Sequence, residues 1–94
     1  MIKVKTSVKK LVDSAKNQIK NLEVNDAIKM HPNKTNLFID VRDIREIQKY
    51  GRIFGAKHVP RCMIEFWIDP ESPYHKHFFN GSYHFIFYCA SDWR

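Results

Sequence analysis

The sequence predicts an α/β domain with a mainly parallel sheet flanked by helices. Short apolar runs suited to buried strands alternate with segments of helical periodicity, and a cysteine directly follows the last apolar run, residues 83–88. This alternation favours parallel pairing, because each helix returns the chain to the same end of the sheet. An apolar fraction of 44% with 14% aromatic residues is typical of a chain that folds around a core. We therefore expect one domain with a modest core.

The first expected element is an amphipathic helix of about 13 residues that Thr6 or Ser7 can cap. Its apolar residues recur at three- and four-residue steps: Val8, Leu11, Val12, Ala15 and Ile19. Residues 1–20 contain six lysines and a single aspartate, so most of the net charge of +6 belongs to this segment. We interpret residues 1–20 as an N-terminal helical extension with a solvated basic face. Contact with nucleic acid or anionic lipid is the less favoured alternative.

Residues 21–94 contain the alternating elements of the predicted domain. In chain order we expect a strand at 22–24, a helix at 25–30 capped by Asn25, a strand at 36–41, a helix at 43–50, a turn and short strand at 55–60, a helix at 63–67, turns at 69–73 and 80–82, and a strand at 83–88. Active groups in such sheets lie beyond the C-terminal ends of the strands. Cys89 is predicted to occupy that position.

The segment from Cys89 to Arg94 is the main candidate site. A thiol at a strand end, a short loop whose N–H groups can converge, and an arginine with a forked donor set favour chemistry on sulfur or on an anion. The alternatives are a buried core cysteine and an exposed surface arginine. Cys62 follows Arg61 on another element, and we expect it to be an inert small buried residue rather than a resolving thiol. Two cysteines form no disulfide framework, so a reduced, cytoplasmic setting is expected.

Two further pairs of residues have a structural and a functional interpretation. Asp40 and Arg42 flank the end of a predicted strand, and an ion pair that holds the following turn is favoured over a role in binding. Phe66 and Trp67 could form a wall of a substrate pocket, and packing in the core is at least as well supported.

The histidines do not predict a metal centre. His75 and His77 lie two residues apart and His84 follows later, but no cysteine or acidic partner is spaced to complete a ligand set. We interpret them as solvated loop residues and expect neither a metal nor a cofactor.

Three separated segments resemble the rhodanese (sulfurtransferase) family. The first is Phe38-Ile39-Asp40-Val41-Arg42-Asp43 with Glu46, the second runs from Gly51 to Arg61, and the third is the cysteine loop. The resemblance covers about residues 22–94, and the order and spacing of all three segments make it specific. The basic helix and residues 63–76 look like a bacterial single-domain branch of that family.

The resemblance implies that Cys89 takes a sulfane sulfur from a donor such as thiosulfate and passes it, through a persulfide, to a thiol or cyanide. The loop residues that would bind the substrate are Ala90, Ser91, Asp92, Trp93 and Arg94: their backbone N–H groups would cradle the sulfur, and Arg94 would attract the anionic donor. Four residues separate Cys89 from Arg94, as in the sulfur-transferring members, whereas the related phosphatases have five. The alternative is a catalytically silent binding or regulatory module, or an inactive fragment.

This chain departs from the family pattern in two respects. Asp92 stands where the family often has glycine, and its charge is expected to raise the pKa of the thiol and weaken anion binding. Family members also continue beyond the loop through a helix, an inserted strand and another helix. We therefore expect the C-terminal part of the domain to be absent, and the chain alone to be unstable, to swap strands in a homodimer, or to be a piece of a longer protein. No nucleic-acid or membrane partner is expected.

Overall fold

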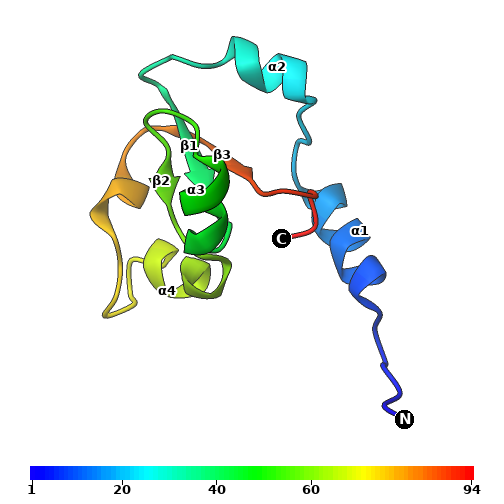
Figure 1. Ribbon diagram of the computed structural model, residues 1–94. Coiled ribbons are helices and arrows are strands. Elements are labelled where there is room, and N and C mark those ends of the chain that lie inside the picture. The colour runs from blue at the N-terminus through cyan, green and yellow to red at the C-terminus, as the bar shows by residue number, and fades with distance from the viewer. The chain divides into compact units, whose positions relative to one another are not determined.

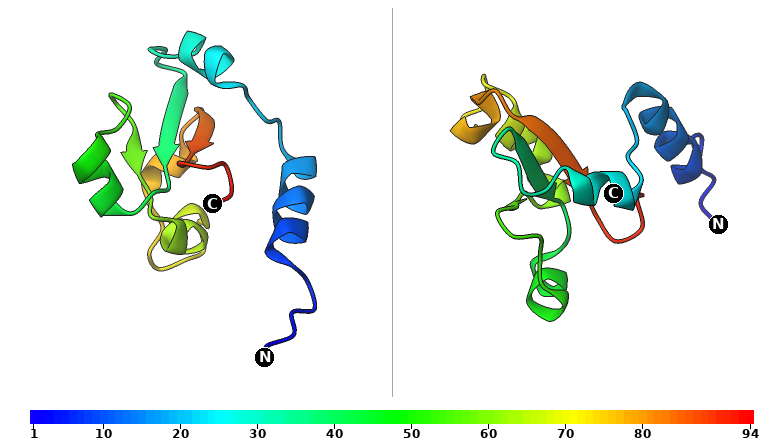
Figure 2. Two further views of the ribbon diagram at one scale, coloured as in Figure 1. Left: turned by 45° about the vertical axis from the view of Figure 1, so that its right-hand side comes forward. Right: turned by 90° about the horizontal axis from the view of Figure 1, so that it is seen from above.

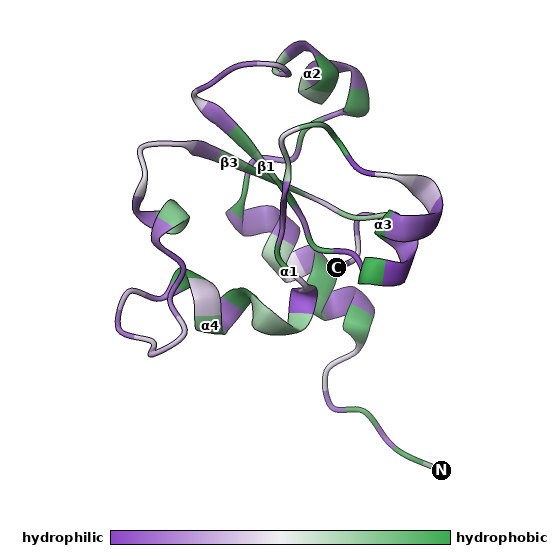
Figure 3. Cartoon of the chain, turned by 60° about the vertical axis from the view of Figure 1, so that its left-hand side comes forward, coloured by the Kyte–Doolittle hydropathy of each residue, from purple (hydrophilic) through white to green (hydrophobic).

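The computed structural model describes residues 1–94 as two units, Met1–Met30 and His31–Arg94 (Figure 1). The first unit contains two helices, α1 (Val8–Gln18) and α2 (Val24–Lys29). The Oγ atom of Ser7 accepts a hydrogen bond from the N–H of Lys10 at 3.1 Å and caps α1, as expected. Hydrophilic and hydrophobic residues both occur along α1 (Figure 3), which fits the amphipathic pattern of its sequence.

The strand expected at residues 22–24 is wrong. Val24 begins α2, and Glu23 rather than Asn25 is the residue that precedes the first turn. The N–H of Ala27 bonds to the carbonyl of Glu23 at 3.0 Å. A short extended segment needs a neighbouring strand to pair its backbone groups, whereas a helix pairs them within itself.

The second unit is built on a three-stranded parallel sheet of order β2-β1-β3 (Figure 2). Its strands are β1 (Asn36–Asp40), β2 (Lys57–His58) and β3 (His84–Tyr88). The register places Asp40 opposite both His58 and Tyr88. The C-terminal ends of all three strands therefore meet at one edge, which confirms the predicted α/β class and parallel pairing.

The helices and 3-10 turns of the second unit lie between the strands in chain order. The structure contains α3 (Ile44–Tyr50), a 3-10 turn at Arg61–Met63, α4 (Ile64–Ile68) and a second 3-10 turn at His77–Asn80. Asp43 and Glu46 form a reciprocal capping box at the start of α3, and Gly51 ends this helix with a positive φ of 77°. The helix expected at 43–50 is confirmed, because both its start and its stop are local signals.

The core lies at the C-terminal half of β1. Ile39 and Val59 have no exposed surface and Val41 has almost none. Partly buried side chains surround these three: Leu37, Ile64, Trp67, Phe78, Phe79, Phe85 and Cys89. Trp67 therefore packs in the core, whereas Phe66 is 50% exposed and contacts the ring of Tyr74 edge-on.

Two expectations about single side chains are wrong. Cys62 is exposed, because it lies within the short 3-10 turn whose neighbour Ile64 packs against the core instead. His75 is not a solvated loop residue: its Nδ1 atom lies 3.0 Å from the carbonyl oxygen of Trp67, and its Nε2 atom is buried without a hydrogen-bond partner. No three histidine, cysteine or acidic side chains gather in a group that could hold a metal ion. None of the helices has the length and apolar character needed to cross a membrane.

Candidate functional site

Cys89 directly follows β3, at the edge where the strands end. The N–H of Val41 donates to the carbonyl oxygen of Tyr88 at 3.2 Å, so the pairing between β1 and β3 extends to the residue before the thiol. The Cys89 side chain is half-buried and packs against the core. The sheet and the core therefore fix the position of its sulfur atom.

The loop after Cys89, the red segment that follows β3 in Figure 1, directs backbone N–H groups at this sulfur. Asp92 has a positive φ of 62°, and its N–H donates to Sγ of Cys89 at 3.1 Å. Burial alone would raise the pKa of the thiol. The backbone hydrogen bonds from Arg94, Ser91, Trp93 and Asp92 outweigh burial, so the pKa of Cys89 is lowered from its ordinary value.

The backbone and the side chain of Asp92 act on Cys89 separately. The N–H of Asp92 is one of the groups that lower the pKa of Cys89, whereas the expected raising of that pKa by the Asp92 carboxylate stays a prediction. Asp92 also occupies a left-handed conformation, which an aspartate adopts at some cost and a glycine adopts freely.

The guanidinium of Arg94 is paired with a carboxylate. Its Nη1 and Nη2 atoms donate to the two carboxylate oxygens of Glu46 at 2.7 and 2.8 Å, between side chains that are 34% and 30% exposed. The Arg94 hydrogen bonds, followed by the N–H of Asp43, lower the pKa of Glu46 to about 2, although partial burial opposes them. The same pair raises the pKa of Arg94. The Arg94 guanidinium, which was expected to attract an anionic donor, is therefore already ion-paired with Glu46.

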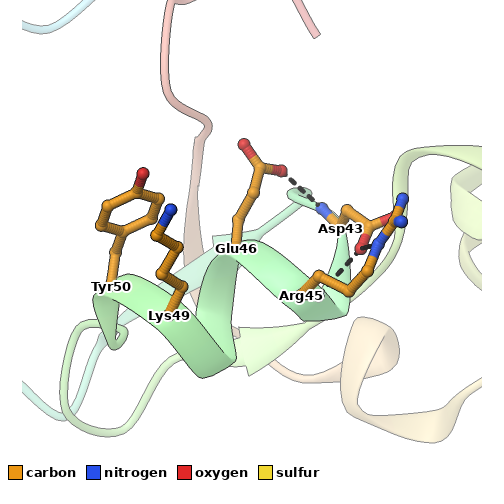
Figure 4. A pocket seen from close by; sticks show the side chains of 5 residues that line it. All are labelled: Asp43, Arg45, Glu46, Lys49 and Tyr50. Carbon is orange, nitrogen blue, oxygen red and sulfur yellow. Dashed lines mark hydrogen bonds and ion pairs between the residues drawn. The ribbon is translucent and has the colours of Figure 1, made fainter.

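Glu46 is the site residue that sequence reasoning missed. It lies on α3, 48 residues before Arg94, and it was noted only as part of a family segment. Figure 4 shows its carboxylate bound to the backbone nitrogen of Asp43, at 2.9 Å. No local signal joins two residues so far apart, so only the folded chain shows that one carboxylate serves both the capping box and the loop arginine.

Asp40 connects the edge of the sheet to the site. Its carboxylate has no exposed surface and accepts hydrogen bonds from the Nε and Nη2 atoms of Arg42, at 3.0 and 2.7 Å, and from the hydroxyl of Tyr88, at 2.8 Å. Burial would raise the pKa of Asp40, but these donors and the N–H of Arg42 together lower it. The ion pair expected between Asp40 and Arg42 is confirmed. We call Asp40, Arg42 and Tyr88 the Asp40 network.

An open hollow of about 270 Å³ lies beside the thiol. It is lined by Arg42, Tyr50, Gly51, Arg52, Ile53, Tyr88 and Cys89. A larger hollow of about 440 Å³ lies along α3 and is lined by Asp43, Arg45, Glu46, Lys49 and Tyr50 (Figure 4). Only the smaller hollow is lined by Cys89, and it is the candidate site for a small substrate.

Comparison with known proteins agrees with this arrangement. The family model of the rhodanese-like domain matches residues 23–94, which include β1, α3, β2, β3 and the cysteine loop. This chain belongs to the rhodanese-like domain family. The division proposed after residue 20 stays a prediction, as do the catalytic roles assigned to Cys89 and to residues 90–94.

One solved structure is similar to almost the whole chain. It is described as a protein of unknown function and possible tyrosine phosphatase from Rhodopseudomonas palustris. The two sequences are 39% identical, the TM-score is 0.91, and the similarity covers 96% of this chain and 70% of that one. A comparison with curated proteins gave no match.

Proposed function

We propose that this rhodanese-like chain is a sulfurtransferase that uses Cys89 as a persulfide carrier. The observation that carries the proposal is the convergence of backbone N–H groups on Sγ of Cys89, which lowers the pKa of the thiol. A thiolate at neutral pH is the reactive form of cysteine, and the same N–H groups can hold the negative charge of a persulfide. The proposed partners are a small sulfur donor and a thiol or cyanide acceptor, in the cytoplasm.

The proposed reaction has two displacements. The Cys89 thiolate attacks the outer sulfur of thiosulfate, and a bond forms between Sγ of Cys89 and that sulfur. The S–S bond of thiosulfate breaks, and sulfite leaves with its electron pair. Cyanide or a thiolate then attacks the outer sulfur of the persulfide, and Cys89 departs as a thiolate. Cyanide yields thiocyanate, and no external oxidant or reductant is needed in either step. The N–H groups around Cys89 stabilise the anionic sulfur before and after each displacement.

A phosphatase activity is the second candidate, because the similar R. palustris protein is described as a possible tyrosine phosphatase. Phosphate is a tetrahedral anion with three terminal oxygens to bind, whereas a sulfane sulfur is a single atom. The loop here has four residues between Cys89 and Arg94, the length that accompanies sulfur transfer in this family. The pairing of Arg94 with Glu46 also removes a forked donor that a phosphate ester would need. Both observations favour sulfur transfer.

The decisive experiment is intact mass measurement after incubation with thiosulfate. We expect the wild-type chain to gain one sulfur atom, the Cys62→Ser variant to gain it too, and the Cys89→Ser variant to gain none. Hydrolysis of p-nitrophenyl phosphate is measured on the same samples. Absence of the added sulfur from the wild-type chain would support the silent binding module. Phosphate release that depends on Cys89, without sulfur loading, would establish the phosphatase. Equal losses in both cysteine variants would indicate a two-cysteine mechanism.

A further inference from the structure

The hollow beside Cys89 contains one cation whose donors are not engaged. Arg42 binds Asp40 and also donates from Nη2 to the carbonyl oxygen of Gly51 at 2.7 Å. Arg94 binds Glu46 through both of its terminal nitrogens and does not line the hollow. Arg52 lines the hollow, is exposed, and makes no hydrogen bond or ion pair. Arg52 is therefore the unpaired cation available to bind an anion that approaches Cys89 through this hollow.

The backbone on both sides of Arg52 is anchored to the Asp40 network. The carbonyl oxygen of Gly51 accepts the bond from Arg42, and the N–H of Ile53 donates to the hydroxyl of Tyr88 at 3.3 Å. Tyr88 in turn is the last residue of β3 and directly precedes Cys89. The base of the Arg52 side chain is thus held at a fixed place relative to the thiol, while its guanidinium is left to bind a ligand.

From this arrangement we infer that Arg52 is the residue that binds the anionic end of a small sulfur donor such as thiosulfate. This inference rests on the proposed sulfurtransferase function. The hollow of about 270 Å³ lies below the usual range for drug-sized ligands, which favours a compact donor. In thiosulfate the outer sulfur is bonded directly to a negatively charged SO3 group. The outer sulfur can then face Cys89 while the oxygens of the SO3 group accept hydrogen bonds from the guanidinium of Arg52.

Alkylation of Cys89 tests the anion site without any need for turnover. Iodoacetate and iodoacetamide react with a thiolate by the same displacement and differ in charge, so the ratio of their rate constants reports the local preference for an anion. All variants contain Cys62→Ser, so that Cys89 is the reactive thiol. We expect Arg52→Gln to lower this ratio about fivefold to tenfold, the size expected for losing one charge-assisted contact at an exposed site. The rate with iodoacetamide should stay unchanged, and Arg52→Lys should retain most of the preference.

Arg45→Gln is the matched control, because Arg45 is also an exposed arginine but lines the other hollow. It removes the same formal charge and should leave the ratio within about twofold, because Arg45 does not line the hollow beside Cys89 and is already paired with Asp43. In the Cys62→Ser reference protein with Arg52 intact, higher ionic strength should lower the ratio. An equal fall in both variants, or an unchanged ratio in Arg52→Gln, would overturn the assignment of Arg52. So would a ratio in that reference protein that does not respond to salt.

Sulfur loading from thiosulfate separates this inference from the proposed function. In Arg52→Gln the thiosulfate concentration that gives half the maximal rate of sulfur loading should rise by about the same factor as the alkylation ratio falls. The limiting rate of loading should change little. A lower limiting rate at the same half-maximal concentration would contradict a binding role for Arg52. If the Cys62→Ser reference protein shows the anion preference and Arg52→Gln loses it, but thiosulfate transfers no sulfur, the anion site stands and the sulfurtransferase proposal fails.

Discussion

Replacing Asp40 with asparagine tests whether the Asp40 network holds the site together. The substitution keeps the size of the side chain and removes the charge that Arg42 and Tyr88 bind. Removing one partner of a fully buried ion pair typically costs about 3–5 kcal/mol. Arg42 is 12% exposed and retains its bond to Gly51, so part of its charge can be solvated after the change. We therefore expect a loss of about 3 kcal/mol in the free energy of unfolding, near the lower end of that range.

Equilibrium unfolding in urea measures this loss, with Asp43→Asn as the matched control. Asp43 faces solvent in its pair with Arg45, and asparagine is an equally good residue at the start of a helix. The control should therefore unfold close to the wild-type midpoint. Similar midpoints for Asp40→Asn and Asp43→Asn would refute the reasoning, because the buried network would then contribute no more than an exposed pair.

The pH dependence of unfolding gives a second measurement, which compares the wild-type chain with Asp40→Asn. The folded-state pKa of Asp40 is lowered, so its contribution to stability is present above its ordinary pKa of about 4 and is lost as the pH falls through the folded value. The wild-type chain should lose stability below about pH 4 more steeply than Asp40→Asn does. Parallel curves for the two proteins would contradict the assigned direction of the shift.

The remaining predictions concern the loop around Cys89. Asp92→Gly should lower the pKa of Cys89 further, because it removes a nearby negative charge and keeps the N–H bond to sulfur. It should also stabilise the fold by up to about 1 kcal/mol, because glycine adopts a positive φ without cost. An unchanged or raised pKa in the pH profile of iodoacetamide alkylation would count against this prediction. Glu46→Gln keeps the capping-box acceptor but loses the charge that holds Arg94. The contacts of Arg94 with Cys89, through its backbone N–H and its side chain, should then be less well ordered, and the pKa of Cys89 should rise. A fall in that pKa would contradict this role of Glu46. Because the pKa of Glu46 is about 2, the pair with Arg94 should persist down to acidic pH and be lost only as the pH approaches that value, which chemical-shift titration of the Glu46 carboxyl carbon can check.

The sequence by itself determined the features that depend on neighbouring residues. Ser7 before the apolar periodicity of α1, the capping box from Asp43 to Glu46 and the stop at Gly51 are local signals, because their hydrogen bonds span only a few residues. The apolar run of β1 indicated a buried parallel strand, and the ion pair between Asp40 and Arg42 spans only two residues. Where a local signal needed a distant partner, as in the strand expected at residues 22–24, the prediction failed.

Only the tertiary structure decided which distant groups meet at the thiol. The register of β1 with β3 brings the hydroxyl of Tyr88 to Asp40, and the packing of α3 brings Glu46 to Arg94, across 48 residues in both cases. These contacts settle which cations are paired, and so leave Arg52 as the free one in the hollow. The pKa of Cys89 depends likewise on the path of the loop, since the direction of each N–H follows from backbone angles and not from residue type. Spacing along the chain places the thiol at a strand end, but the electrostatic environment of that thiol is a property of the folded chain.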